Sequence, residues 1–125
     1  MFETALRNRV RTALPGSHVE WDMRPQASSY PAVVLELIAG ERAQTFGGVQ
    51  QTQRDRIQFS IFAMSKPVAV NIREALIALL TTPASVDDTE FQRGEIVLYR
   101  SDVEDTENGP VRIEIVDAYL WHSTP

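Results

Sequence analysis

The clearest strand pattern in the chain is Arg56–Ala63, whose sequence is RIQFSIFA. Apolar and polar residues alternate along it, and successive side chains of a strand point to opposite faces of a sheet. The stretch therefore predicts a strand with one buried face and one polar face. Phe62 interrupts the polar face, so we expect it to be exposed and available for contact with another chain.

A second strand is predicted upstream, at Ala32–Ile38, because this short stretch is apolar and rich in β-branched residues. Its near-continuous apolar character is typical of a central strand. Gly40–Gln53, between the two strands, is polar and contains glycine, which predicts an exposed connection or the projecting tip of a long hairpin. Its Gly47-Gly48 pair lacks the lysine of a P-loop, which argues against a phosphate-binding loop. We therefore expect these glycines to form a turn.

Two amphipathic helices are predicted. Apolar residues recur at spacings of three and four along Phe2–Leu14, and Pro15-Gly16 ends that helix. The second helix begins after Ser65, a good N-cap, and ends near Thr82-Pro83. Each helix has one apolar stripe that must be buried against another element.

The remainder predicts two more strands. Pro83–Gly94 is polar and is expected to be a connection, whereas Ile96–Val103 and Val111–Trp121 are predicted strands joined by a turn at Asn108-Gly109. The apolar alternation of the last strand changes phase near Ile115-Val116, which predicts a bulge or a strong twist.

With a short extended segment at His18–Met23, the order of elements is α-β-β-β-α-β-β. Strands joined by short turns pair antiparallel, and two amphipathic helices need a sheet face to cover. We therefore expect an α+β fold, with a four- or five-stranded, mostly antiparallel sheet and two helices packed on one face. A chain of 125 residues can bury the core of one domain, so residues 1–125 are expected to form a single unit.

Composition excludes several classes of protein. The absence of cysteine rules out disulfide scaffolds, thiol nucleophiles and iron–sulfur sites. A formal charge of −5 makes a poor surface for gripping nucleic acid or an anionic membrane. No apolar run is long enough to cross a bilayer. We expect a soluble, intracellular domain without cofactor or metal.

The sequence offers few candidate catalytic residues. The two histidines, His18 and His122, lie near opposite ends of the chain, and no motif of a serine hydrolase or a zinc protease is present. We therefore expect no catalytic site and no enzyme. Asp117 lies at the phase change of the last strand and is expected to be buried or paired across subunits.

Acidic and basic residues each form local groups. The acids Asp87, Asp88 and Glu90 and the acids Asp102, Glu104, Asp105 and Glu107 do not follow the spacing of a calcium loop, which favours solvated turns. Arg7, Arg9 and Arg11 are close together on the first helix. They favour a solvated helix face, with a partner of opposite charge as the alternative.

Six segments of the chain, taken in order, carry a resemblance to a known family: Arg24-Pro25-Gln26, Ser29–Leu35, Ile57–Ala63, Ala69–Leu76, Val111–Ile115 and Leu120-Trp121-His122. Their order and spacing resemble those of the tail completion (tail terminator) proteins of long-tailed bacteriophages and gene transfer particles. Tyr30-Pro31 opens one strand and Trp121-His122 closes the last, and the resemblance extends over nearly the whole chain. Each motif is weak by itself; the resemblance lies in their order.

The resemblance implies a structural protein. Members of this family form a ring, usually hexameric, that caps the tail tube, ends its polymerisation and joins the head. The implied partners are other copies of the chain, the tail tube protein and a head–tail connector protein, while DNA passes through without specific binding. The implied location is the tail–head junction of the virion, and the host cytoplasm during assembly. The family supplies no catalytic residues.

Within such a ring, we expect Phe62, Arg7 and Arg11 at interfaces, because they are the residues most available for a partner. Acids rather than arginines are expected along the channel, since a basic wall would retain DNA. At least one acidic segment, Asp87–Glu90 or Asp102–Glu107, is therefore expected at the channel or its rim. The alternatives are another neck or head-completion protein, or a small ligand-binding or enzymatic α+β domain, for which a pocket with convergent polar groups would be needed.

Overall fold

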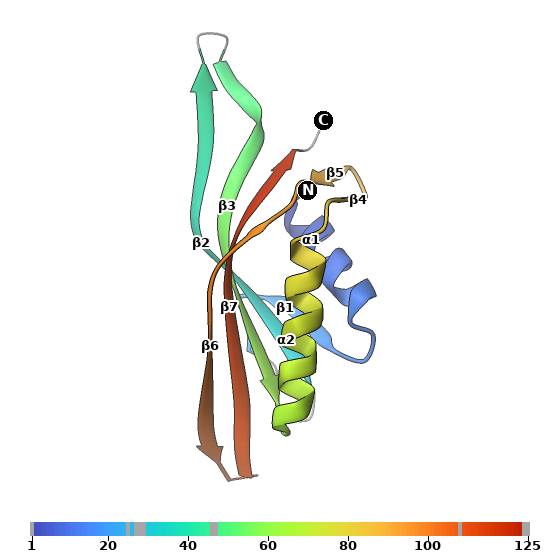
Figure 1. Cartoon of the computed structure of the whole chain (residues 1–125), viewed down its shortest axis with the longest axis vertical. Helices are drawn as coiled ribbons and strands as arrows, with labels where there is room; N and C mark the ends of the chain where they lie inside the picture. Colours follow the sequence, from blue (N-terminus) through green and yellow to red (C-terminus); the bar gives the residue numbers. More distant parts are fainter. Residues whose placement is uncertain (1, 25, 27–29, 46–47, 108, 124–125) are drawn as a thin grey trace.

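The computed structural model describes residues 2–24, 26, 30–45, 48–107 and 109–123, and for residues 41–45 and 48–51 the backbone alone. Its elements are α1 (Phe2–Ala13), β1 (His18–Trp21), β2 (Ala32–Thr45), β3 (Gly48–Ala63), α2 (Lys66–Leu80), β4 (Ala84–Val86), β5 (Thr89–Phe91), β6 (Glu95–Thr106) and β7 (Gly109–Ser123). Figure 1 shows one sheet with both helices on the same side of it.

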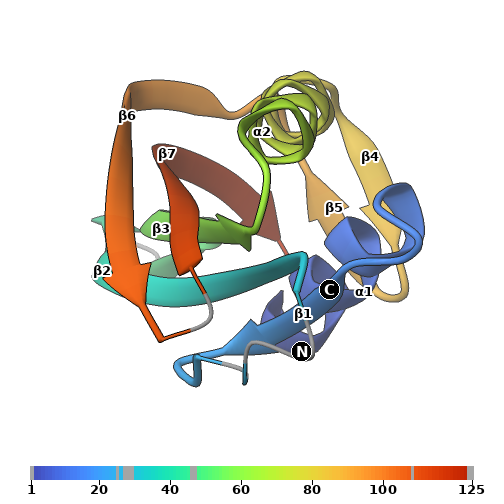
Figure 2. The same cartoon turned by 90° about the horizontal axis from the view of Figure 1, so that it is seen from below.

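The sheet has seven strands in the order β1-β2-β3-β7-β5-β4, and β6 pairs with β7 outside this path. β1 runs parallel to β2, and the other pairs are antiparallel. Seen along its length, the sheet curls strongly around the side that carries the helices (Figure 2).

The expected four- or five-stranded sheet is therefore wrong: the sheet contains seven strands, is curled into a half-barrel, and is mixed because β1 and β2 are parallel. The additional strands β4 and β5 arise from Pro83–Gly94, where three-residue strands are too short to produce a readable alternation. They form because β5 pairs with the end of β7, through Glu90↔Ser123 and Phe91↔His122.

Gly40–Gln53 belongs to a long hairpin, the second of the two alternatives for this segment. β2 and β3 pair from Ala32↔Phe62 to Thr45↔Gly48, and the hairpin extends beyond the helices at one end of the molecule (Figure 1). The predicted Gly47-Gly48 turn lies partly outside the described residues. At the other end, the β6–β7 hairpin projects in the opposite direction (Figure 1).

Of the two alternatives predicted near Ile115-Val116, a bulge or a strong twist, the bulge is wrong, because β7 pairs with both neighbours without interruption there. A register shift occurs instead on β6, between Ile96 and Leu98. The apparent phase change has another cause: the two halves of β7 bury opposite faces. Val111, near its start, packs on the face without helices, while Val116, Ala118 and Leu120 pack under them.

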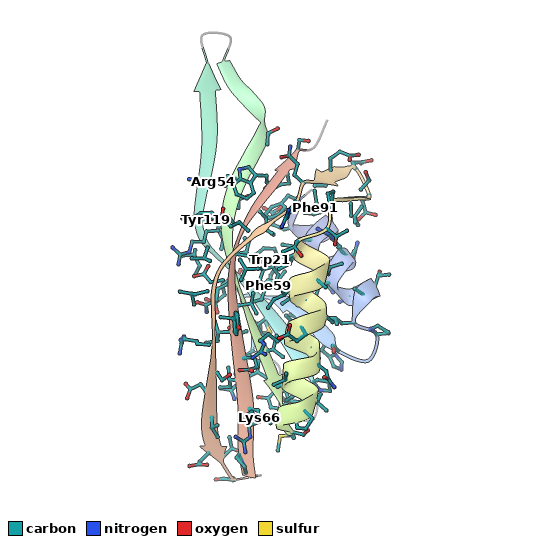
Figure 3. All side chains as sticks on the ribbon, viewed as in Figure 1. Trp21, Arg54, Phe59, Lys66, Phe91 and Tyr119 are labelled. Atoms are coloured by element: carbon teal, nitrogen blue, oxygen red, sulfur yellow. The ribbon has the colours of Figure 1, made fainter. Side chains whose placement is uncertain are left out.

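The main core lies between the sheet and the two helices. Leu6 and Val10 of α1, with Leu76 and Leu80 of α2, meet the inner face of the sheet around Phe59, which is fully buried (Figure 3). The helices cover this face because their apolar stripes have no other apolar surface of comparable size to bury. Arg9, on the same side of α1, is also buried, which the three-arginine pattern did not predict.

Gly94 joins β5 to β6 where the chain passes tightly under the end of α2. Its N–H donates to the carbonyl oxygen of Leu80 at 2.8 Å. A Cβ atom at this position would lie 2.7 Å from that oxygen and 3.2 Å from the carbonyl oxygen of Tyr119. Both neighbours are backbone atoms that cannot rotate away, so this position has room for glycine alone.

We expect Gly94→Ala to lower the free energy of unfolding by about 2 kcal/mol, the usual cost of forcing atoms into a packed site. Urea denaturation would measure it. Gln92→Ala, an exposed position in the same connection, is the control and should change stability by less than about 0.5 kcal/mol. Equal stability of the two variants would contradict the close approach.

Candidate functional site

A buried pair of side chains, His122 and Asp55, joins β3 to β7 at the base of the β2–β3 hairpin. His122 Nε2 lies 2.5 Å from Asp55 Oδ2, and the two side chains are 4% and 2% exposed. Gln53 Nε2 donates to both oxygens of Asp55 at 3.1 Å. The ring of Phe2 stacks on His122 with centroids 3.7 Å apart. These contacts connect α1 to the base of the hairpin.

We expect His122→Ala to lower the free energy of unfolding by about 3 kcal/mol, because it leaves the carboxylate of Asp55 buried beside a cavity. His18→Ala is the matched control, since His18 is the other histidine and is exposed. Denaturation of both variants would measure the difference.

A double-mutant cycle tests whether the two side chains act as a pair. Asp55→Asn should cost less in the His122→Ala background than in the native chain. Strictly additive costs would show that Asp55 and His122 contribute independently and would contradict this interpretation.

The face of the sheet without helices carries charged and aromatic side chains in contact with one another. Arg56 donates to both oxygens of Asp117, from Nε at 2.9 and 3.1 Å, and Asp117 raises the pKa of Arg56. The guanidinium groups of Arg56 and Arg54 lie 5.9 and 4.6 Å from the ring centroid of Tyr119. Asp117 is buried, as expected, and its partner belongs to the same chain.

Phe62 lies on this face but is only 8% exposed, so its expected exposure is wrong. It stacks on Tyr30 with centroids 5.8 Å apart, and the guanidinium of Arg24 lies 4.6 Å above its ring. Arg24 also donates to Glu104 Oε2 at 3.0 Å, and this hydrogen bond, with a second to Tyr30, raises the pKa of Arg24. An interface role for Phe62 stays a prediction; within one chain Phe62 packs in a second, smaller core.

The three arginines of α1 have different environments. Arg9 Nη2 donates to the carbonyl oxygens of Leu79 and Thr82 at 2.6 and 2.5 Å, where it satisfies the C-terminal end of α2. Burial lowers the pKa of Arg9. Arg7 and Arg11 remain partly exposed and share one partner, Glu20, at 3.5 and 3.6 Å.

The two acidic segments lie far apart, toward opposite ends of the molecule (Figure 1). Asp87 lies in the β4–β5 turn and accepts a hydrogen bond from Asn8 of α1 at 3.2 Å. Asp88 follows it in that turn, and Glu90 accepts from Ser85 at 2.6 Å.

The second acidic segment, Asp102–Glu107, covers the end of β6 and the β6–β7 turn. Strand alternation places Asp102 and Glu104 on the face without helices, where Glu104 meets Arg24. Asp105 belongs to the opposite face, and Glu107 is in the turn.

A small pocket of about 150 Å³ lies between the first turn of α2 and the β6–β7 hairpin. Lys66 and Arg112 line it together with Glu114, which is 3% exposed. Glu114 Oε1 accepts from Arg73 at 2.8 Å, whereas Oε2 has no hydrogen-bond partner. Hydrogen bonds to Glu74 and the charge of Glu114 raise the pKa of Arg73. No local pattern in the sequence predicts this pocket, because its residues come from three separate segments.

Among the described residues, no group of three or more His, Asp or Glu side chains is placed to hold a metal ion. None of the helices in the described part of the chain has the length and apolar character needed to span a membrane.

Besides the short outer edge of β4, two longer edges of the sheet are unpaired in the described part of the chain. β6 pairs with β7 alone, and beyond Leu35, where β1 ends, β2 pairs with β3 alone. Of the nine large hydrophobic side chains exposed among the described residues, six lie on these two strands: Leu37, Ile38, Val97, Leu98, Tyr99 and Val103. Sequence reasoning did not identify them, because only the pairing shows which strands are at the edges.

Comparison with solved structures finds chains whose fold is similar to that of this protein. The chain is similar to one in the structure of the virion of a native gene transfer agent particle, with a TM-score of 0.57, 14% identity and 97% of each chain covered. A second solved structure, whose name describes no function, gives a TM-score of 0.53 at 14% identity, over 99% of this chain and 92% of that one. No protein-family model and no curated protein sequence matches the chain.

Proposed function

We propose that this chain is a structural protein of a phage-like particle, with the role of a tail completion or tail terminator protein. The observation that carries the proposal is the full-length fold match to a chain in a gene transfer agent virion. It is supported by the order of sequence motifs, which resembles that family over nearly the whole chain. A structural rather than an enzymatic role is part of the proposal.

In this role the chain forms a ring, hexameric by analogy with the family, at the tail–head junction of the virion. One side of the ring meets the tail tube protein and the other meets the head–tail connector protein. Two features support such contacts: hairpins project from opposite ends of the molecule (Figure 1), and sheet edges with exposed apolar residues remain open. Rings arise when one surface of a subunit binds a different surface of the next and the rotation closes.

Addition of the purified chain to its polymerising tail tube protein should end tube growth and shorten the tubes. Electron microscopy of tube lengths, with the chain bound at one end only, would measure this. The same chain added after heat unfolding is the control.

Binding along the sides of tubes, or binding to head connectors without an effect on tube length, would contradict terminator activity. The second of these outcomes would favour the alternative role of a neck protein.

We further propose that the face without helices lines the channel, because the helices then lie outside the ring. Arginines on this face are partly neutralised: Arg56 pairs with Asp117, and Arg24 pairs with Glu104. Such pairs leave fewer free cations for phosphate groups. Of the two acidic segments, Asp102–Glu107 then contributes Asp102 and Glu104 to the channel, and Asp87–Glu90 lies outside it.

Asp102→Lys with Glu104→Lys should make the assembled ring bind duplex DNA with an affinity that falls steeply with salt, since each neutralised phosphate adds to the salt dependence. The control, Asp87→Lys with Asp88→Lys, makes the same change of charge and should gain much less. DNA binding measured over a series of salt concentrations would compare them. Equal or absent gains would contradict this orientation.

A further inference from the structure

Strand directions make the two open edges of the sheet compatible with each other. Across β2, β3, β7 and β6 every pair is antiparallel, and β1 runs parallel to β2. β6 therefore runs opposite to β1 and β2. If copies are related by rotation about an axis along the strands, β6 of one copy meets β1 and β2 of the next in antiparallel orientation.

The two edges also lie at the same height. Strand registers place His18, Ala32, Phe62, Ile113 and Asp102 in one row across the sheet. A second row runs from Trp21 through Leu35, Phe59 and Val116 to Tyr99. A neighbouring copy can therefore extend the sheet without a large displacement along the strands.

The β6 edge has two of the features that protect an edge strand from pairing, five charged residues among its twelve and one register shift, but it lacks others. Its pairing with β7 runs over Glu95–Thr106, about twice the usual length of a strand, and it contains neither proline nor lysine. One register shift interrupts it, near Val97. Beyond that shift, Leu98, Tyr99 and Val103 are 45%, 54% and 47% exposed. On the opposite edge of the sheet, Leu37 and Ile38 are 56% and 47% exposed.

Charges differ between the two edges. Arg11 lies at the outer side of β1, where its Nη2 is 3.5 Å from the carbonyl oxygen of Val19. Arg7 and Arg11 share Glu20 as a partner, so two cations and one anion lie together beside β1, while Asp22 and Glu36 are exposed farther along the same edge. Toward its end, β6 carries the exposed acid Asp105 on the face with helices, and Glu107 is exposed in the turn that follows. Opposite charges favour contact between different edges over contact between identical ones.

We propose that copies of this chain join edge to edge, with β6 of one copy antiparallel to β1 and the open part of β2 of the next. The contact extends the sheet from copy to copy, and Arg7 and Arg11 face the acids of the neighbouring β6–β7 hairpin. This inference rests on the proposed ring and adds the surfaces that form it. The occupant of each edge is a second copy of this chain.

Because the sequence contains no cysteine, introduced cysteines are the only thiols that can form a disulfide. Disulfide trapping therefore tests the proposed contact between copies. Directly opposed residues of antiparallel strands have Cα atoms about 5 Å apart, which suits a disulfide. His18→Cys is first combined with Asp102→Cys, because the two positions lie in the same row of the sheet. It is then combined with Arg100→Cys and with Glu104→Cys, which test a register between the copies that is shifted by two residues in either direction. After mild oxidation, at least one of the three double variants should give a ladder of linked copies on a denaturing gel.

Two controls separate this contact from other arrangements. His18→Cys combined with Asp88→Cys, which is exposed in the β4–β5 turn and on neither edge strand, should give no ladder. Each single-cysteine variant should remain monomeric on the gel. Efficient dimers from Asp102→Cys alone would show that β6 pairs with β6 through a two-fold contact, which would overturn the inference.

Solution mass of the native chain, alone and with tail tubes, distinguishes failure of this inference from failure of the proposed function. A native oligomer without a ladder in any double variant would overturn the edge contact and leave the ring intact. A native monomer that binds tubes but gives no ladder on them would also overturn it, and would assign the edges to the tube protein. A monomer that neither binds tubes nor forms ladders would overturn both proposals.

Discussion

Pairing along β7 is the constraint on which the rest of the structure depends. One side of this strand is occupied by β3 over nearly its full length, and the other is divided between β6 and, at His122 and Ser123, β5. Because no further strand lies beyond β6, its outer edge stays open among the described residues. The helices cover the inner face, so the open surfaces are the outer face, one edge at β6, one edge at β1 and β2, and the short outer edge of β4.

Buried charges are placed where elements meet. Arg9 satisfies carbonyl groups at the end of α2, His122 and Asp55 join β7 to the base of the β2–β3 hairpin, and Arg73 reaches Glu114 from α2. Each of these groups would be costly to bury without its partner. The charges therefore restrict how the helices and the hairpin sit on the sheet, while the apolar core supplies most of the favourable free energy.

The proposed function and the proposed contact between copies use different parts of this arrangement. The function depends on the whole fold, which is shared with a chain of a gene transfer agent virion over 97% of both chains. The contact depends on strand direction, register and exposed side chains at two edges. Neither uses the pocket beside Glu114, whose side-chain oxygen Oε2 has no hydrogen-bond partner.

The sequence by itself determined both helices and the strands with clear alternation, because these depend on local periodicity. It left Gly40–Gln53 as either an exposed connection or the tip of a long hairpin, and strand pairing decided for the hairpin. It also indicated that Asp117 would be buried or paired. Tertiary structure alone decided the rest: β4 and β5 exist because β7 offers them an edge, Phe62 is covered because Tyr30 and Arg24 lie over it, and Arg9 is buried because the end of α2 reaches it. Each of these outcomes depends on a partner distant in sequence or on a free edge, and neither leaves a pattern in neighbouring residues.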